Sequence, residues 1–308
     1  MAEQPLRILS LDGGGVRSLS TLRILEAIMR QLARQHATNN PGAPELSPRP
    51  CDYFDLICGT STGGLIALMI GRLRMVTYPS IITKTQSVHD AIDTYKELSE
   101  SVFGDTRPWD PKVRSDCLGK EIERIIQSPS IQLEDPVPNP CTFVVSTGAG
   151  PVRMRSYETD GPSILEAARA TMAAPNYFSP ITIKGIQYGG RIGCNNPAKE
   201  AVLEAQTKWP GRPIGILVSI GTGLEDPLSF NDKSTESVVR CLTSSEPVHQ
   251  DLIERDDISN YFRFNVQGMS SIGLAEWDKV EDINALTATY LEHGEIKPWI
   301  RKIANLLQ

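Results

Sequence analysis

The sequence contains one pentapeptide with clear potential for nucleophilic chemistry, Gly-Thr-Ser-Thr-Gly at residues 59–63. The pattern G-x-S-x-G presents a reactive serine when a strand precedes it and a helix follows it. Both conditions are expected here, because residues 54–58 are typical of a short buried strand and residues 65–73 of a helix that is apolar on every side. We therefore predict that Ser61 is a nucleophile and not only a helix cap. The predicted nucleophile elbow comprises Gly59, Thr60, Ser61, Thr62 and Gly63.

A glycine-rich turn at residues 12–18 follows a strand predicted over residues 6–11 and precedes an amphipathic helix over residues 19–32. The turn lacks the Lys-Ser/Thr ending of a phosphate-binding loop, and Ser18 replaces the third glycine of a dinucleotide-binding turn. Its consecutive glycines can direct several backbone N–H groups to one point at a helix N-terminus, with the positive charge of Arg17 added. That arrangement suits the oxyanion of acyl transfer. Nucleotide binding and a close strand–helix connection without chemistry are the alternatives.

A serine nucleophile needs a base, and the histidines do not provide an obvious one. His36, His89, His249 and His293 lie in polar or helical contexts without a supporting acid motif. We therefore expect surface roles for them and no Ser-His-Asp triad. If the site is catalytic, another group must accept the serine proton.

The remaining periodicity predicts alternating strands and helices. Further strands are expected at residues 141–146, 152–157, 181–186, 214–220 and 261–266, and helices at residues 88–102, 118–126 and 163–172 and after Trp277. Ser163 and Glu166 have the spacing of a capping box, and Pro175 ends the helix that they begin. The alternation predicts an α/β fold with a mainly parallel central sheet covered by helices on both faces.

The composition is that of a globular protein without a nucleic-acid partner. Among 308 residues, 31 Lys and Arg against 37 Asp and Glu give a net charge of −6, so no basic excess attracts a phosphate backbone. No apolar run approaches the roughly 18 residues of a transmembrane helix, and no signal peptide is evident. We expect one domain over residues 1–308, with a core over about 6–225 and a helical portion over about 226–308, in a cytoplasmic protein that can associate peripherally with membranes.

Taken with three later segments, the two turns resemble the patatin-like phospholipase family, in particular its fungal members. Residues 168–175, 195–197 and 219–223 are similar to landmarks of that family, and the resemblance extends over nearly the whole chain. It implies a three-layer fold and hydrolysis of lipid acyl esters through an acyl-Ser61 intermediate, with no metal or organic cofactor. It also implies that the oxyanion amides belong to Gly14, Gly15 and Val16, with Arg17 beside them.

The resemblance further implies a lipid or phospholipid substrate, taken from a membrane or micelle surface. It also suggests that the domain belongs to a longer regulatory protein. Headgroup, acyl position and oligomeric state are not encoded in any motif that we identify.

The family's base is an aspartate six residues before the Asn-Asn-Pro element, and this chain has Gly189 at that position. A one-residue shift would place Tyr188 there, whose ordinary pKa near 10 leaves it protonated at neutral pH. Three explanations remain open: a natural pseudoenzyme, an aspartate lost by substitution or sequence error, or a base from elsewhere such as Asp160 or Asp226. The function is therefore expected to be lipid acyl hydrolysis or, alternatively, lipid binding or signalling by a catalytically impaired protein.

Overall fold

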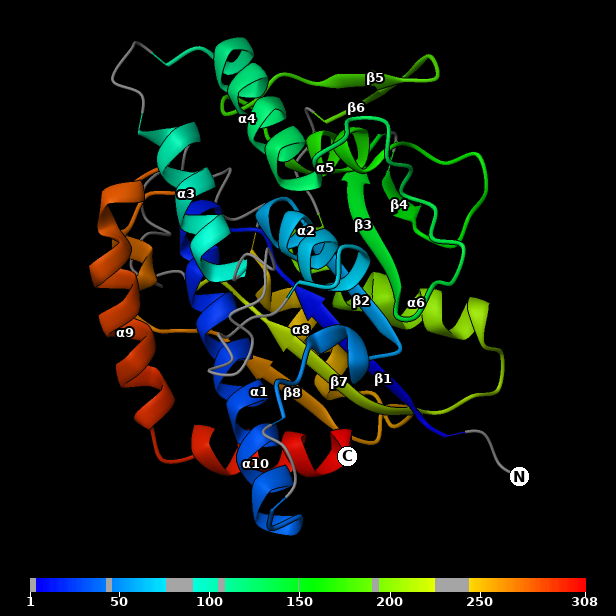
Figure 1. Cartoon of the computed structure of the whole chain (residues 1–308), viewed down its shortest axis with the longest axis vertical. Helices are drawn as coiled ribbons and strands as arrows, with labels where there is room; N and C mark the ends of the chain where they lie inside the picture. The colour runs from blue at the N-terminus through cyan, green and yellow to red at the C-terminus, as the bar shows by residue number, and fades with distance from the viewer. Residues whose placement is uncertain are drawn as a thin grey trace.

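The computed structural model describes residues 4–42, 46–75, 91–104, 109–148, 150–189, 194–224 and 244–308. At its centre is a six-stranded sheet with the order β4-β3-β2-β1-β7-β8 (Figure 1). Neighbouring strands are parallel except β3 and β4, which are antiparallel. The strands of this sheet are β1 (Leu6–Leu11), β2 (Leu56–Thr60), β3 (Cys141–Thr147), β4 (Pro151–Arg155), β7 (Ile214–Ile220) and β8 (Tyr261–Phe264).

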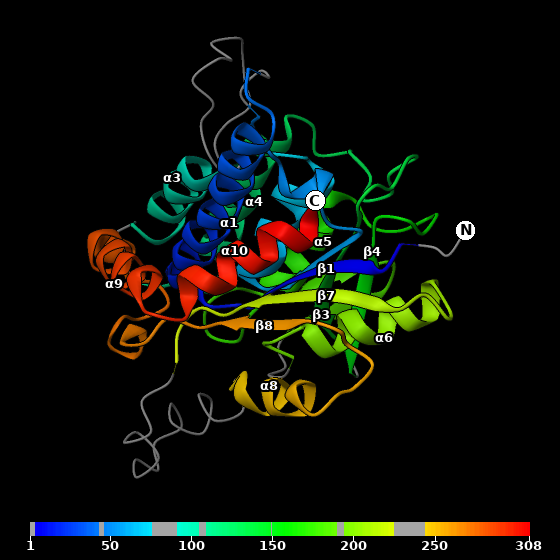
Figure 2. The ribbon, with the colours of Figure 1, turned by 90° about the horizontal axis from the view of Figure 1, so that it is seen from below.

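Helices cover both faces of the sheet, which confirms the predicted three-layer α/β class. Figure 2 shows α6 and α8 on one side and α1, α3, α9 and α10 on the other. Side chains alternate along β1 accordingly, because Leu9 and Leu11 join one hydrophobic core while Leu6 and Ile8 join the second. The helices are α1 (Ser18–Asn39), α2 (Thr62–Ala67), α3 (Ala91–Phe103), α4 (Pro111–Ile126), α5 (Ile164–Met172), α6 (Ala198–Lys208), α8 (Glu246–Ile253), α9 (Val280–Glu292) and α10 (Ile296–Leu307).

Most predicted elements are present, but α1 extends seven residues beyond its predicted end at residue 32, and α4 begins seven residues before its predicted start at residue 118. The predicted helix over residues 65–73 begins earlier, at Thr62, and continues into a π-helical turn over Leu68–Arg72, in which the Leu73 N–H donates to the Leu68 carbonyl. The start of the helix predicted at Val88 lies outside the described residues, and α3 is described from Ala91.

The prediction of one strand over residues 181–186 was wrong. The segment is a hairpin of β5 (Ile181–Ile183) and β6 (Ile186–Tyr188), which form a separate two-stranded sheet. Lys184 and Gly185 turn the chain with φ values of 50° and 80°. Two successive positive φ angles are the signature of a tight hairpin turn, so the apolar run changes direction at its centre.

The capping box is confirmed at the start of α5. The Glu166 N–H donates to Ser163 Oγ over 3.2 Å, and the Ser163 N–H donates to Glu166 Oε2 over 2.8 Å. This satisfies two N–H groups that a helix start leaves without intrahelical partners. The cap fixes the beginning of the helix whose last turn, described below, contacts Ser61.

The register of the parallel strands brings their carboxyl ends together. Leu11, the last residue of β1, pairs with Gly59 of β2 on one side and with Ile220 of β7 on the other. The turns that follow these three strands therefore meet at one edge of the sheet, the usual place for a binding site in an open α/β fold.

Candidate active site

Ser61 lies in a strained turn between β2 and α2. Its backbone angles are φ 53° and ψ −127°, a combination that non-glycine residues rarely adopt. A Cβ added at Gly59 would lie 2.1 Å from the Gly63 carbonyl oxygen, and one added at Gly63 would lie 2.3 Å from the Asp12 carbonyl oxygen. Both flanking positions therefore require glycine, as expected for a turn that presents a nucleophile.

A threonine of α5 holds this strained turn. The Ser61 N–H donates to Thr171 Oγ1 over 2.8 Å, and the Thr171 hydroxyl donates to the Val145 carbonyl over 2.6 Å. One hydroxyl thus links the elbow to β3 through two hydrogen bonds, which helps to stabilise the unusual backbone. This role of Thr171 was not predicted, because residues 168–175 are notable in the sequence only as a family landmark. The available signal was a hydroxyl among the alanines and methionine of an apolar helix.

The glycine turn is hydrogen-bonded directly to the helix that follows Ser61. The Gly14 N–H donates to Thr62 Oγ1 over 3.1 Å, and the same oxygen lies 2.7 Å from Ser18 Oγ. Thr62 is buried. The structure thus brings together the two turns that the sequence analysis identified, 48 residues apart, and fixes their relative position through one threonine side chain.

The backbone N–H groups predicted to form the oxyanion hole differ in what they contact. The Gly14 N–H donates to Thr62 Oγ1. The Val16 N–H donates to the Leu274 carbonyl over 2.9 Å, and the Arg17 N–H donates to the Gly14 carbonyl over 3.2 Å. Within the described ranges, the Gly15 N–H has no acceptor. In this conformation Gly15, with φ 56°, is therefore the residue of the four whose amide is available to a ligand.

The Arg17 side chain is buried rather than exposed at the turn. It is 5% exposed, and its Nε donates to the Ile272 carbonyl over 2.6 Å. A Cβ added at Gly15 would lie 2.0 Å from the Leu274 carbonyl oxygen. The segment before α9 thus packs closely against the glycine turn, and Arg17 anchors it there.

The loop before α6 forms another side of the site. A Cβ built at Gly13 would lie 2.7 Å from Asn195 Oδ1 and 2.9 Å from Ser61 Cβ, so these two side chains flank the same point. The Thr60 hydroxyl donates to the Cys194 carbonyl over 2.9 Å and keeps this loop against β2. Asn195 is therefore an amide side chain close to the serine, a neighbour that the sequence indicated only as part of Asn-Asn-Pro.

A buried ion pair lies at the entrance to the glycine turn. Arg263 of β8 donates to both carboxylate oxygens of Asp12, with Nη2–Oδ2 at 2.6 Å and Nη1–Oδ1 at 3.0 Å. Burial raises the pKa of Asp12, and the Arg263 charge acts in the opposite direction. Because Arg263 binds both carboxylate oxygens, the ion pair holds the start of the glycine turn against β8.

Gly189, which the resemblance predicts to be at the position of the family's base, has neither a carboxylate nor space for a side chain. Its φ is 94°, and its N–H donates to the Thr147 carbonyl over 2.9 Å. A Cβ added there would lie 2.3 Å from Ala173 Cβ and 2.7 Å from the Ala173 carbonyl oxygen. The backbone at this position is therefore built for glycine.

The alternative bases are placed as follows. Asp160 lies in an exposed turn, and its carbonyl oxygen accepts a hydrogen bond from Lys184 at the tip of the β5–β6 hairpin. Tyr188 belongs to β6 and pairs with Ile181. Asp226 lies outside the described residues.

The histidines, which were not expected to act as the base, are placed as follows. His36 Nδ1 is 3.4 Å from the Asn40 amide nitrogen at the end of α1, and His249 Nδ1 is 3.0 Å from the Tyr261 hydroxyl. Burial lowers the pKa of His249. His293 follows α9, and His89 is outside the described part. A surface role was expected for His249, but it is partly buried against Tyr261.

The described residues contain neither a metal-ligand cluster nor a membrane-spanning helix. In this part of the chain, no group of three or more His, Cys, Asp or Glu side chains is arranged to hold a metal ion. No described helix combines the length and the apolar character needed to cross a bilayer.

A strained serine turn beside a glycine turn at the carboxyl edge of a parallel sheet defines an α/β protein with a candidate nucleophile site. Comparison with known families agrees with this class. The family model described as "Patatin-like phospholipase" matches residues 9–202, so the chain belongs to the patatin-like phospholipase family.

The chain is similar to several curated phospholipases. It is 27% identical to human calcium-independent phospholipase A2-gamma over 98% of this chain and 40% of that protein. It is 28% identical to Phospholipase A I of Arabidopsis thaliana over 72% of this chain and 21% of that protein. It is 29% identical to a cGAMP-activated phospholipase of Escherichia coli over 65% of this chain and 55% of that protein. The chain therefore spans about two fifths of the length of the human relative.

Proposed function

We propose that this protein hydrolyses acyl esters of lipids through a covalent acyl-Ser61 intermediate. The observation that carries the proposal is the backbone of Ser61, φ 53° and ψ −127°, held by Thr171 at the start of α2. Strain of this kind is maintained only where surrounding contacts enforce it, and such positions cluster at active sites. The N-terminus of α2 adds a partial positive charge where an oxyanion would form.

The proposed substrate is a phospholipid in a membrane or micelle, attacked from the aqueous side. Support comes from the three relatives, each of which is named as a phospholipase.

The chemistry proceeds in two steps. Ser61 Oγ attacks the ester carbonyl carbon, the C–O bond to the glycerol oxygen breaks, and the serine proton passes to that leaving oxygen. Water then attacks the acyl-Ser61 carbonyl, which releases the fatty acid and returns a proton to Ser61. The Gly15 N–H, which has no acceptor within the described residues, is the proposed donor to the oxyanion in both steps.

The first step lacks the family's general base, since residue 189 is glycine. General-base catalysis is worth about 10²–10⁴-fold, so acylation is expected to be slow by this factor. The same observation favours a second candidate function, a lipid-binding or signalling module that keeps the fold of the site with little turnover.

A fluorophosphonate probe separates these candidates. The folded chain is treated with the probe, with Ser61→Ala as the test variant and Ser130→Ala, which removes an exposed serine, as the matched control. Labelling that is lost only in Ser61→Ala, together with fatty-acid release from phosphatidylcholine vesicles, supports the hydrolase. Labelling without fatty-acid release supports the impaired module. Absence of labelling in the folded protein contradicts a working nucleophile.

A further inference from the structure

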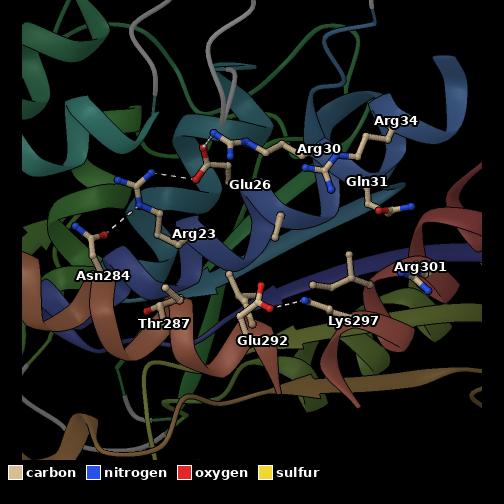
Figure 3. A pocket seen from close by; sticks show the side chains of 14 residues that line it. Arg23, Glu26, Arg30, Gln31, Arg34, Asn284, Thr287, Glu292, Lys297 and Arg301 are labelled. Carbon is tan, nitrogen blue, oxygen red and sulfur yellow. Dashed lines mark hydrogen bonds and ion pairs between the residues drawn. The ribbon is translucent and has the colours of Figure 1, made fainter. Parts of the chain in front are cut away.

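A second site of the described structure lies between α1, α9 and α10, helices that do not carry Ser61. It is a cavity of about 570 Å³. Figure 3 shows the side chains that line it, which come from α1 on one side and from α9 and α10 on the other. The volume falls in the range of about 300–1,000 Å³ that is typical of small-molecule sites. We refer to it as the basic cavity, for the reason given next.

Among the charged side chains that line the basic cavity, cations predominate. Five carry a positive charge and two a negative charge, a local net charge of +3 in a chain whose overall net charge is −6. A concave surface with one sign of charge concentrates ligands of the opposite sign. The cations are Arg23, Arg30, Arg34, Lys297 and Arg301, and the anions are Glu26 and Glu292.

Both carboxylates of the cavity are already engaged. Glu26, whose side chain is 8% exposed, accepts Arg23 at 3.0 Å and Arg30 at 2.7 Å. Glu292 pairs with Lys297 (Figure 3). The acidic groups therefore serve to hold three of the five cations and leave two unmatched.

Arg34 and Arg301 are the unmatched cations. Neither has a carboxylate within ion-pair distance among the residues that the structure describes, and both side chains are exposed. They come from facing helices, since the neighbour of Arg34, Gln35, donates to the Arg301 carbonyl over 3.4 Å. Two guanidinium groups on adjacent helices can each donate paired hydrogen bonds to the oxygens of one anion.

The rest of the lining is apolar or neutral. Ala27, Ala288, Leu291 and Ile300 supply apolar surface between the helices, and Asn284 adds an amide that accepts from Arg23 Nε over 3.1 Å. A cavity with an apolar wall and a cationic rim suits an organic molecule with an anionic group at one end better than it suits a free halide.

We propose that the basic cavity binds a phosphate ester, with Arg34 and Arg301 as its principal donors. Phosphate is favoured over a carboxylate because its oxygens can accept from two guanidinium forks at once. A soluble phosphorylated molecule and the headgroup of an anionic phospholipid share this chemistry. The binding is independent of the nucleophile, so the Ser61→Ala protein is expected to bind as the unchanged chain does.

Calorimetric titration of the full chain with inorganic pyrophosphate tests the proposal for the soluble source. The test variant is Arg34→Gln/Arg301→Gln. The matched control, Lys112→Gln/Lys120→Gln, removes two exposed cations from α4, which does not line the cavity. Loss of two charge-assisted interactions predicts at least about a tenfold weaker affinity in the test variant and no comparable change in the control. Because all four side chains are exposed, the variants should fold, which their melting temperatures verify.

Vesicle sedimentation tests the lipid source. Vesicles of phosphatidylcholine alone are compared with vesicles containing one third phosphatidylglycerol. A headgroup site predicts binding to the anionic vesicles that the arginine variant loses and the lysine control retains. Binding of pyrophosphate with no vesicle preference assigns the cavity to a soluble ligand. Failure of the unchanged chain to bind either probe, or equal loss of binding in both variants, would overturn the proposal.

Discussion

Placing a side chain at Gly189 tests the structural account of the missing base. The sequence resemblance predicts an aspartate at this position, so Gly189→Asp is the obvious attempt to restore activity. The structure predicts that the substitution destabilises the protein, because φ is 94° and the new Cβ would lie 2.3 Å from Ala173 Cβ. Gly189→Ala shares both penalties and lacks the carboxylate, and is therefore the matched control.

The expected loss of unfolding free energy on substitution of Gly189 has two parts. A non-glycine residue in a left-handed conformation costs about 1–2 kcal/mol. Insertion of a carbon into a tightly packed contact costs about 1–3 kcal/mol more. We therefore expect both variants to lose about 2–5 kcal/mol of unfolding free energy, a large part of the roughly 5–15 kcal/mol of a typical domain. Ala173→Gly combined with Gly189→Asp removes the Cβ–Cβ contact and should recover part of this loss.

Urea denaturation followed by circular dichroism measures the loss, and the rate of fluorophosphonate labelling measures any restored activity. Single variants as stable as the unchanged chain would refute the reasoning from Ala173. So would a large gain in labelling rate with Gly189→Asp alone, because it would mean that the backbone accommodates the carboxylate without rearrangement. A gain only in the double variant would indicate that the site is intact and limited by its base.

Three other perturbations test the contacts around the site. Thr171→Val keeps the side-chain shape but removes the hydroxyl bonded to Ser61, so labelling should slow and stability should fall by about 1–3 kcal/mol, whereas Thr289→Val, at an exposed helical hydroxyl, should change neither. Arg263→Met leaves the Asp12 carboxylate buried and unpaired and should cost about 3–5 kcal/mol in urea denaturation, with a smaller loss in the double variant that also carries Asp12→Asn. Burial lowers the pKa of His249 below 6.5, so the native state binds fewer protons than the unfolded chain. Its stabilising contribution is present above pH 6.5 and is lost as pH falls towards the lowered pKa, and melting curves of His249→Gln should lack this part of the pH dependence.

Short sequence patterns correctly predicted several strands and one helix start. The bounds of β1 and β7 follow from short apolar runs, and the start of α5 from the Ser163–Glu166 spacing, because strand burial and helix capping are decided within a few residues. The hairpin at Lys184 was missed because alternation of apolar residues does not mark where a strand reverses, and a lysine with positive φ is uncommon.

The amino-acid sequence by itself determined that Ser61 stands in a glycine-flanked turn and that residue 189 carries no acid, since both facts depend only on residue type and spacing. The tertiary structure decided what supports the serine and what excludes a replacement base. Thr171 reaches the Ser61 amide from 110 residues away, Arg263 reaches Asp12 from 251 residues away, and Ala173 fills the space beside Gly189. These contacts join separate elements, and packing between elements is set by the whole fold rather than by any local pattern.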